Sequence, residues 1–232
     1  MKTSFWTKLF DLVSPRFCCV CGQRMAATEQ VLCSTCLLHL PRTNFCKTPL
    51  DNPMARLFWG LVPVEKAAAW FYYEAKSEVG TLIHDMKYHN RPDVGVTLGR
   101  LMAAELQLYD FFEGIDALVP VPLTRRRKWQ RGYNQSYEIA RGISQLTGLP
   151  IYNKVIARRQ FAKSQTRMGL WQRRANVEHA FTLRDAKDLE GLHLLVVDDI
   201  VTTGSTVMAC MKALQKAGNV KLSVLSLGFS KS

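Results

Sequence analysis

The chain has 232 residues, of which 47% are hydrophobic, and it carries a net charge of +12 at pH 7. This length is enough for one medium-sized α/β domain with a small appendage. No apolar run approaches the roughly 20 residues that a membrane helix needs, so the sequence excludes a membrane span.

Residues 1–13 predict a short amphipathic helix, because aromatic and aliphatic side chains alternate there with Lys2, Lys8 and Asp11. The segment lacks the uninterrupted apolar core and the small-residue cleavage site of a secretory signal. The sequence therefore predicts a cytoplasmic protein.

Two C-x-x-C pairs follow, Cys18 with Cys21 and Cys33 with Cys36. Each pair can place two thiolates on one ion, and four sulfurs match tetrahedral Zn²⁺, which predicts a structural zinc site. Disulfide bonds are the alternative, and a cytosolic setting disfavours them. A redox-active C-x-x-C is a further alternative, but the presence of two such pairs favours a metal site.

Two other cysteines lie near this module. Cys19 stands inside the first pair and could replace Cys18 as a ligand, whereas Cys46 has no partner in sequence. Residues 47–64 then contain three prolines and a glycine that interrupt regular structure. We therefore expect a cysteine module with the N-terminal helix over residues 1–50 and a main domain over residues 64–232.

The main domain alternates strands and helices. Apolar runs predict strands at residues 67–73, 116–121, 192–197 and 221–227. Ser77 is a predicted N-cap for a helix carrying Val79, Leu82, Ile83 and Met86, and further helices are predicted at residues 94–108, 133–146 and 205–216. This order predicts an α/β fold with a parallel sheet flanked by helices.

Positive charge is concentrated between residues 117 and 177, where Glu138 is the only acid among thirteen lysines and arginines. Such a field attracts phosphate, either on a small substrate or along a nucleic acid, although a solvated basic face is the alternative. The nucleic-acid candidates are Arg125, Arg126, Arg127, Lys128, Arg173 and Arg174. Trp129, within this run, could stack on a base or pack against the protein.

The segment from Leu194 to Thr206 contains the candidate ligand-binding residues. An apolar strand ends at Asp198 and Asp199, and the hydroxyl-rich loop after it, with Gly204, opens a helix. Free N–H groups at a helix start form a cradle for a monophosphate. The two acids suit a ribose diol with a bridging Mg²⁺, so the loop predicts a sugar 5-phosphate site. The alternative is an ordinary helix cap beside two incidental surface acids.

This segment resembles the 5-phosphoribosyl-1-pyrophosphate (PRPP) signature of type I phosphoribosyltransferases. Other motifs, together with the cysteine module, resemble the ComF family of competence proteins, in particular its GntX branch, which is linked to the use of external DNA as a nutrient. They are Val119–Leu123, Arg131–Gln135, Gln165, Arg173–Asn176 and Ala180–Phe181.

The resemblance implies a type I phosphoribosyltransferase fold with Asp198 and Asp199 as catalytic residues and Mg²⁺ bound with PRPP. It implies that residues 120–122 wrap the pyrophosphate, and that a mobile loop at residues 160–174 closes over the reacting carbon. The PRPP-binding residues would be Val121, Arg131, Lys163, Thr202, Thr203, Gly204, Ser205 and Thr206.

Three functions fit these features. The chain could be an enzyme that transfers phosphoribose from PRPP to an unidentified acceptor, although the cysteine module and the basic segment disfavour simple base salvage. It could be a non-catalytic sensor of PRPP or a nucleotide that holds single-stranded DNA. It could also be an adaptor whose zinc module docks a protein of DNA uptake or recombination.

Overall fold

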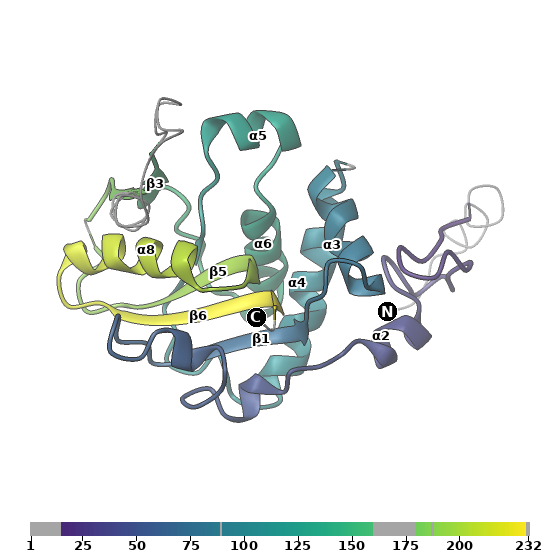
Figure 1. Ribbon diagram of the computed structural model, residues 1–232, viewed down its shortest axis with the longest axis horizontal. Coiled ribbons are helices and arrows are strands. Elements are labelled where there is room, and N and C mark those ends of the chain that lie inside the picture. Colours follow the sequence, from purple (N-terminus) through teal and green to yellow (C-terminus); the bar gives the residue numbers. More distant parts are fainter. Residues whose placement is uncertain (1–14, 89, 160–179, 187, 231–232) are drawn as a thin grey trace.

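The computed structural model describes residues 15–88, 90–159, 180–186 and 188–230 (Figure 1). The predicted helix at residues 1–13 and the predicted closing loop at residues 160–174 lie outside these ranges. So do the candidate site residues Lys163, Arg173 and Arg174.

A four-stranded parallel sheet forms the centre of the molecule, in the order β1-β6-β5-β2. Figure 1 shows β6 between β1 and β5. The strands are β1 Ala67–Tyr72, β2 Ala117–Pro120, β5 His193–Val201 and β6 Lys221–Phe229. The inner strands β5 and β6 are almost entirely buried, as continuous apolar strands are when helices cover both faces of a sheet. The predicted parallel sheet is therefore confirmed.

Helices lie on both faces of this sheet. On one face α4 (Pro92–Gln107) packs on α6 (Gln135–Thr147), and on the other lies α8 (Ser205–Leu214), which the 3₁₀ helix η3 (Gln215–Ala217) extends (Figure 1). A Cβ atom on Gly142 would lie 2.0 Å from the Val96 carbonyl oxygen, so glycine permits the close approach of α4 and α6. The remaining long helix, α3 (Glu78–Tyr88), begins after Ser77, whose hydroxyl oxygen accepts a hydrogen bond from the Gly80 N–H at 3.2 Å.

Within residues 64–232, three short elements of the described chain have no counterpart among the predicted ones. Helix α5 (Arg125–Arg131) buries none of its residues, so it has no apolar periodicity that could reveal it. Strands β3 (Ile156–Arg158) and β4 (Phe181–Leu183) form an antiparallel ribbon of three residues each. Pieces this short carry too little pattern to be recognised from sequence.

The N-terminal part contains helix α2 (Ser34–His39) and the 3₁₀ helices η1 (Phe45–Lys47) and η2 (Ala55–Leu57). Within the proline-containing segment, Met54 and Phe58 are completely buried. The buried apolar side chains form one cluster that runs from Cys18 to Phe229. The division into a cysteine module and a main domain stays a prediction.

None of the helices in the described ranges is both long enough and apolar enough to cross a bilayer.

Candidate functional site

Two neighbouring carboxylates lie near the C-terminal end of β5, the edge at which parallel sheets bind ligands. The Oδ1 atom of Asp198 accepts hydrogen bonds from the Ser136 hydroxyl at 3.0 Å and from the Asp199 N–H at 2.9 Å. The Oδ2 atom of Asp199 lies 3.0 Å from Lys87 Nζ. Helices α6 and α3 thus hold the acidic pair from outside the strand.

Asp198 has an altered protonation equilibrium. Burial, and then the nearby charge of Asp199, raise the pKa of Asp198 to about 7 from a usual value of 3.8. The hydrogen bonds that its Oδ1 atom accepts act in the opposite direction. The ionised form of this carboxyl is therefore less favoured than that of an exposed aspartate.

Beyond the acids, the loop at residues 202–206 encloses a hollow of about 40 Å³. This is roughly three times the space that one ordered water needs, enough for a small tetrahedral anion. Gly204 has a left-handed φ of 72° at the N-cap of α8, so the first N–H groups of the helix face no capping side chain from this residue. The hydroxyls of Thr203 and Ser205 lie 2.8 Å apart. The predicted phosphate residues Thr202, Thr203, Gly204, Ser205 and Thr206 all line this hollow.

The segment that follows β2 borders β5. The Val121 N–H donates to the Val197 carbonyl at 2.9 Å, and the Val121 carbonyl accepts from Asn134 Nδ2 at 3.0 Å. Arg131 Nη1 donates to Gln135 Oε1 at 2.9 Å. Within the described residues, the buried atoms Asn134 Oδ1 and Gln135 Nε2 have no hydrogen-bond partner. Such unsatisfied groups at the edge of a site are typical of a place where water or a ligand completes the hydrogen bonding.

The basic helix α5 projects from the body of the molecule (Figure 1). Its residues Arg125, Arg126, Arg127 and Lys128 are exposed. Trp129 is 86% exposed, which rules out the packing role that the sequence left open for it.

Sequence reasoning missed Lys87 and Ser136 as neighbours of the acidic pair, because each comes from a helix with no motif of its own. It also left Arg158 of β3 without a role. The Arg158 guanidinium lies 5.3 Å from the Phe181 ring, and burial, followed by the charge of Arg127, lowers its pKa. An apolar setting of this kind favours an anionic partner for the guanidinium.

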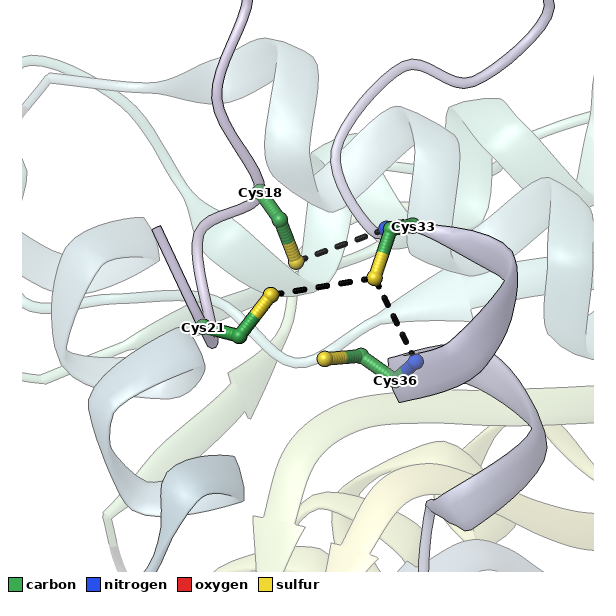
Figure 2. Close-up of side chains that lie close together, drawn as sticks. All are labelled: Cys18, Cys21, Cys33 and Cys36. Atoms are coloured by element: carbon green, nitrogen blue, oxygen red, sulfur yellow. Dashed lines mark hydrogen bonds between the residues drawn. The ribbon is translucent and has the colours of Figure 1, made fainter. Parts of the chain in front are cut away.

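A second candidate site lies in the cysteine module, where Figure 2 shows Cys18, Cys21, Cys33 and Cys36 pointing toward one another. Their sulfur atoms all lie within 4.8 Å of one another, and those of Cys21 and Cys33 are 3.8 Å apart. Zinc–sulfur bonds of about 2.3 Å in a tetrahedron place sulfurs about 3.8 Å apart. The four thiols therefore fit a four-coordinate metal ion.

The thiols also influence one another's protonation. Although burial acts against it, backbone hydrogen bonds at Cys21, Cys33 and Val20 lower the pKa of Cys18 to about 7. Burial and the neighbouring cysteines instead raise the pKa of Cys36. A bound metal ion would favour the thiolate form that coordination requires.

The other cysteines are placed differently. In the described part of the chain, Cys19 and Cys46 are not members of this cluster. Cys210 is completely buried in α8, as expected for a core residue.

Comparison with protein families shows that residues 93–226 match the phosphoribosyl transferase domain. This span contains β2, α6 and the whole acidic and hydroxyl-rich segment, whereas Lys87 lies before it.

Two of the relatives below cover nearly the whole chain, and a third covers about two thirds of it. The DNA utilization protein YhgH of Escherichia coli O157:H7 is 31% identical, over 90% of this chain and 88% of that protein. Its counterpart in Salmonella typhi is 28% identical, over 93% and 98%. Competence protein F of Haemophilus influenzae is 31% identical, over 63% of this chain and 66% of that protein.

Among solved structures, a purine phosphoribosyltransferase from Pyrococcus horikoshii covers 61% of this chain and 84% of its own, with 14% identity and a TM-score of 0.35. A likeness of this strength supports no conclusion about function.

Proposed function

Because this chain belongs to the phosphoribosyltransferase domain family and to its ComF/GntX branch, we propose that it binds PRPP with Mg²⁺ and acts in the cytoplasm in the uptake or use of external DNA. One observation carries the PRPP proposal: two carboxylates lie beside a hollow lined by hydroxyls at the start of a helix. A sugar phosphate needs both features side by side, since its phosphate requires N–H and hydroxyl donors and its diol requires acceptors. The DNA role is carried over from the relatives named for DNA utilization and competence.

Each part of the site would bind a different part of PRPP. The loop at residues 202–206 holds the 5-phosphate, and Asp198 and Asp199 accept hydrogen bonds from the ribose hydroxyls. Val121 and Arg131 border the pyrophosphate, with Lys163 as a further cation. Displacement at the sugar carbon needs positioning and charge stabilisation rather than a nucleophilic side chain.

The donor sets suit two different metal ions. Carboxylate oxygens are the ligands that Mg²⁺ prefers, and that ion would neutralise charge on the leaving pyrophosphate. Four cysteine sulfurs suit Zn²⁺, which we assign to Cys18, Cys21, Cys33 and Cys36. Asp198 and Asp199 would orient the sugar, and the zinc would be structural.

The PRPP proposal is tested by thermal unfolding and calorimetry with Mg²⁺ and PRPP. A ligand present at 100 times its Kd stabilises the folded state by about 2.7 kcal/mol. For a chain of this size, that stabilisation raises Tm by roughly 5–10 °C. Asp199→Asn is expected to remove this shift, whereas Asp110→Asn, which removes an exposed charge, keeps it. No shift in the unaltered protein at saturating PRPP would refute the proposal. A subsequent screen of bases and oligonucleotides for pyrophosphate release identifies an acceptor.

A second function, binding of single-stranded DNA, is favoured by the exposure of Trp129 among the cations of α5. Stacking of a base on an aromatic ring contributes about 1–3 kcal/mol, and phosphate contacts make binding depend on salt. Trp129→Ala should weaken binding of a labelled oligonucleotide at least about fivefold.

Neutralising Arg125, Arg126, Arg127 and Lys128 together should flatten the salt dependence of DNA binding. A control that removes two exposed charges outside α5, Lys216 and Lys221, should leave the salt dependence unchanged. Equal salt dependence in both sets of variants would show that DNA does not bind at α5.

A further inference from the structure

The last turn of α3 contacts the candidate site at three consecutive residues. The Met86 carbonyl accepts a hydrogen bond from the Tyr133 hydroxyl. Lys87 Nζ lies 3.0 Å from Asp199 Oδ2, and the Tyr88 ring lies 5.5 Å from the Arg131 guanidinium. Arg131 is the last residue of α5 and Tyr133 lies between α5 and α6, so this turn is held in place on both sides of Lys87.

The ion pair between Lys87 and Asp199 is largely shielded from water, with side-chain exposures of 19% and 15%. Attraction between charges strengthens when water is excluded, and removal of one partner leaves the other charge uncompensated. Here the ammonium also lies near a second carboxyl, and its charge favours the ionised form of Asp198. Lys87 thus offsets the mutual repulsion of the two neighbouring acids.

We propose that Lys87 is the internal counter-ion of the Asp198–Asp199 pair, which a divalent cation must displace from Asp199 when it binds. The inference rests on the proposed PRPP site and assigns to it a positioning residue from outside the family's strand–loop–helix motif. Lys87 and a divalent cation compete for the same carboxylate oxygens, because both are attracted to the charge of Asp199. Without a phosphate ligand, the protein should therefore bind Mg²⁺ weakly. The oxygens of a phosphate ligand would also bind the ion and so favour displacement of Lys87 from Asp199.

Displacement would not remove the ammonium from the site. The contacts of Met86 and Tyr88 keep the end of α3 in place whether or not the ion pair is formed. The released positive charge then stays at the edge of the site, where it favours an anionic ligand.

The test uses Mn²⁺ as the probe, titrated by electron paramagnetic resonance into the zinc-loaded, full-length protein without PRPP. Lys87→Met should bind Mn²⁺ about tenfold more tightly than the unaltered protein, because the competing charge is gone. Lys87→Gln should show the same gain. Because it keeps a hydrogen-bond donor for Asp199, it tests the proposal even if the methionine variant misfolds. Lys87→Arg, which keeps the charge, should show none.

Lys76→Met is the matched control, since it removes an exposed lysine just before the same helix and should leave Mn²⁺ affinity unchanged. The inference is overturned if Lys87→Met and Lys76→Met bind Mn²⁺ equally well, or if both uncharged variants at position 87 bind it more weakly or not at all. The PRPP proposal is judged separately by the thermal shift with PRPP, so the failure of one does not imply the failure of the other.

Discussion

Asp198 contributes to folding stability in a direction unusual for a carboxyl group. Its pKa in the folded state, about 7, lies above its usual value of 3.8. Between about pH 4 and pH 7 the folded state therefore holds a proton that the unfolded state has lost, and folding stability falls as the pH rises through this window. Above pH 7 the buried carboxylate is ionised, and its burial lowers the folding stability.

Asp198→Asn should relieve this cost. The amide oxygen can still accept the hydrogen bond from Ser136, and the amide carries no charge to bury. We expect the variant to be more stable than the unaltered protein at pH 8 by about 1–3 kcal/mol, since one pKa unit corresponds to about 1.4 kcal/mol.

The measurement is urea unfolding from pH 4 to pH 8, in which the variant should show a smaller loss of stability with rising pH. Asp110→Asn serves as the control, because Asp110 is exposed and its substitution should leave the pH dependence unchanged. If Asp198→Asn and Asp110→Asn show the same pH profile, the assignment of the titration to Asp198 is wrong.

At this scale the sequence points to candidate site residues but not to what surrounds them. Asp198 and Asp199 could be identified because they follow an apolar strand and precede a hydroxyl-rich turn. Lys87 and Ser136 could not, since contacts between distant segments arise only when the helices pack on the sheet. The roles of the candidate PRPP residues stay predictions for the same reason: geometry places them together without showing what they bind.

At the scale of elements, the turn between β5 and α8 depends on Gly204. Its φ of 72° is unfavourable for other L-amino acids, and an added Cβ would lie 3.2 Å from the Phe58 ring. The segment around Phe58, which the sequence marks only as irregular, thus packs against the predicted phosphate loop.

Gly204→Ala should therefore destabilise the protein by about 1–2 kcal/mol and also displace the loop that forms the anion hollow. Gly191→Ala is the matched control: its φ is 80°, and its Cβ would have no atom within 4 Å. Both variants should lose similar stability in urea unfolding, but only Gly204→Ala should lose the thermal shift with Mg²⁺ and PRPP. If the Gly204→Ala variant retains the thermal shift, this turn is not required for ligand binding.

The elements themselves were predictable where burial gives them a period. Three strands of the sheet and the helices α3, α4, α6 and α8 lie close to their predicted positions. The strand predicted at residues 192–197 is longer than expected, since β5 continues through Asp198 and Asp199 to Val201. Helix α5 was not predicted, although Thr124 before it and Gly132 after it are typical cap residues. Caps alone are a weaker signal than an apolar face, because the same residues are common in turns.

At the scale of the whole molecule, hydrogen bonds connect the cysteine module to helix α4. The Gln30 side-chain oxygen accepts hydrogen bonds from the Arg100 guanidinium at 2.5 Å and from the Thr97 hydroxyl at 3.3 Å, both on α4. Arg16 donates to the carbonyls of Ala27 and Glu29 and so braces the loop between the two cysteine pairs. A metal ion that orders this loop should therefore also stabilise the N-terminal half of α4.

Loss of the metal should destabilise residues beyond the four cysteines. Cys33→Ser removes one of four sulfurs, and because the binding energy of a structural zinc is also folding energy, we expect loss of zinc and a lower Tm. Hydrogen exchange should become faster in residues 26–34 and at the start of α4, where Gln30 no longer holds Thr97 and Arg100. Cys19→Ser is the matched control, since this sulfur follows Cys18 in sequence but lies outside the cluster, and it should retain zinc as measured by mass spectrometry. If Cys19→Ser loses zinc and Cys33→Ser keeps it, the four-cysteine assignment is wrong. If both retain zinc but only Cys33→Ser unfolds more easily, the cluster stabilises the protein by packing rather than through a metal.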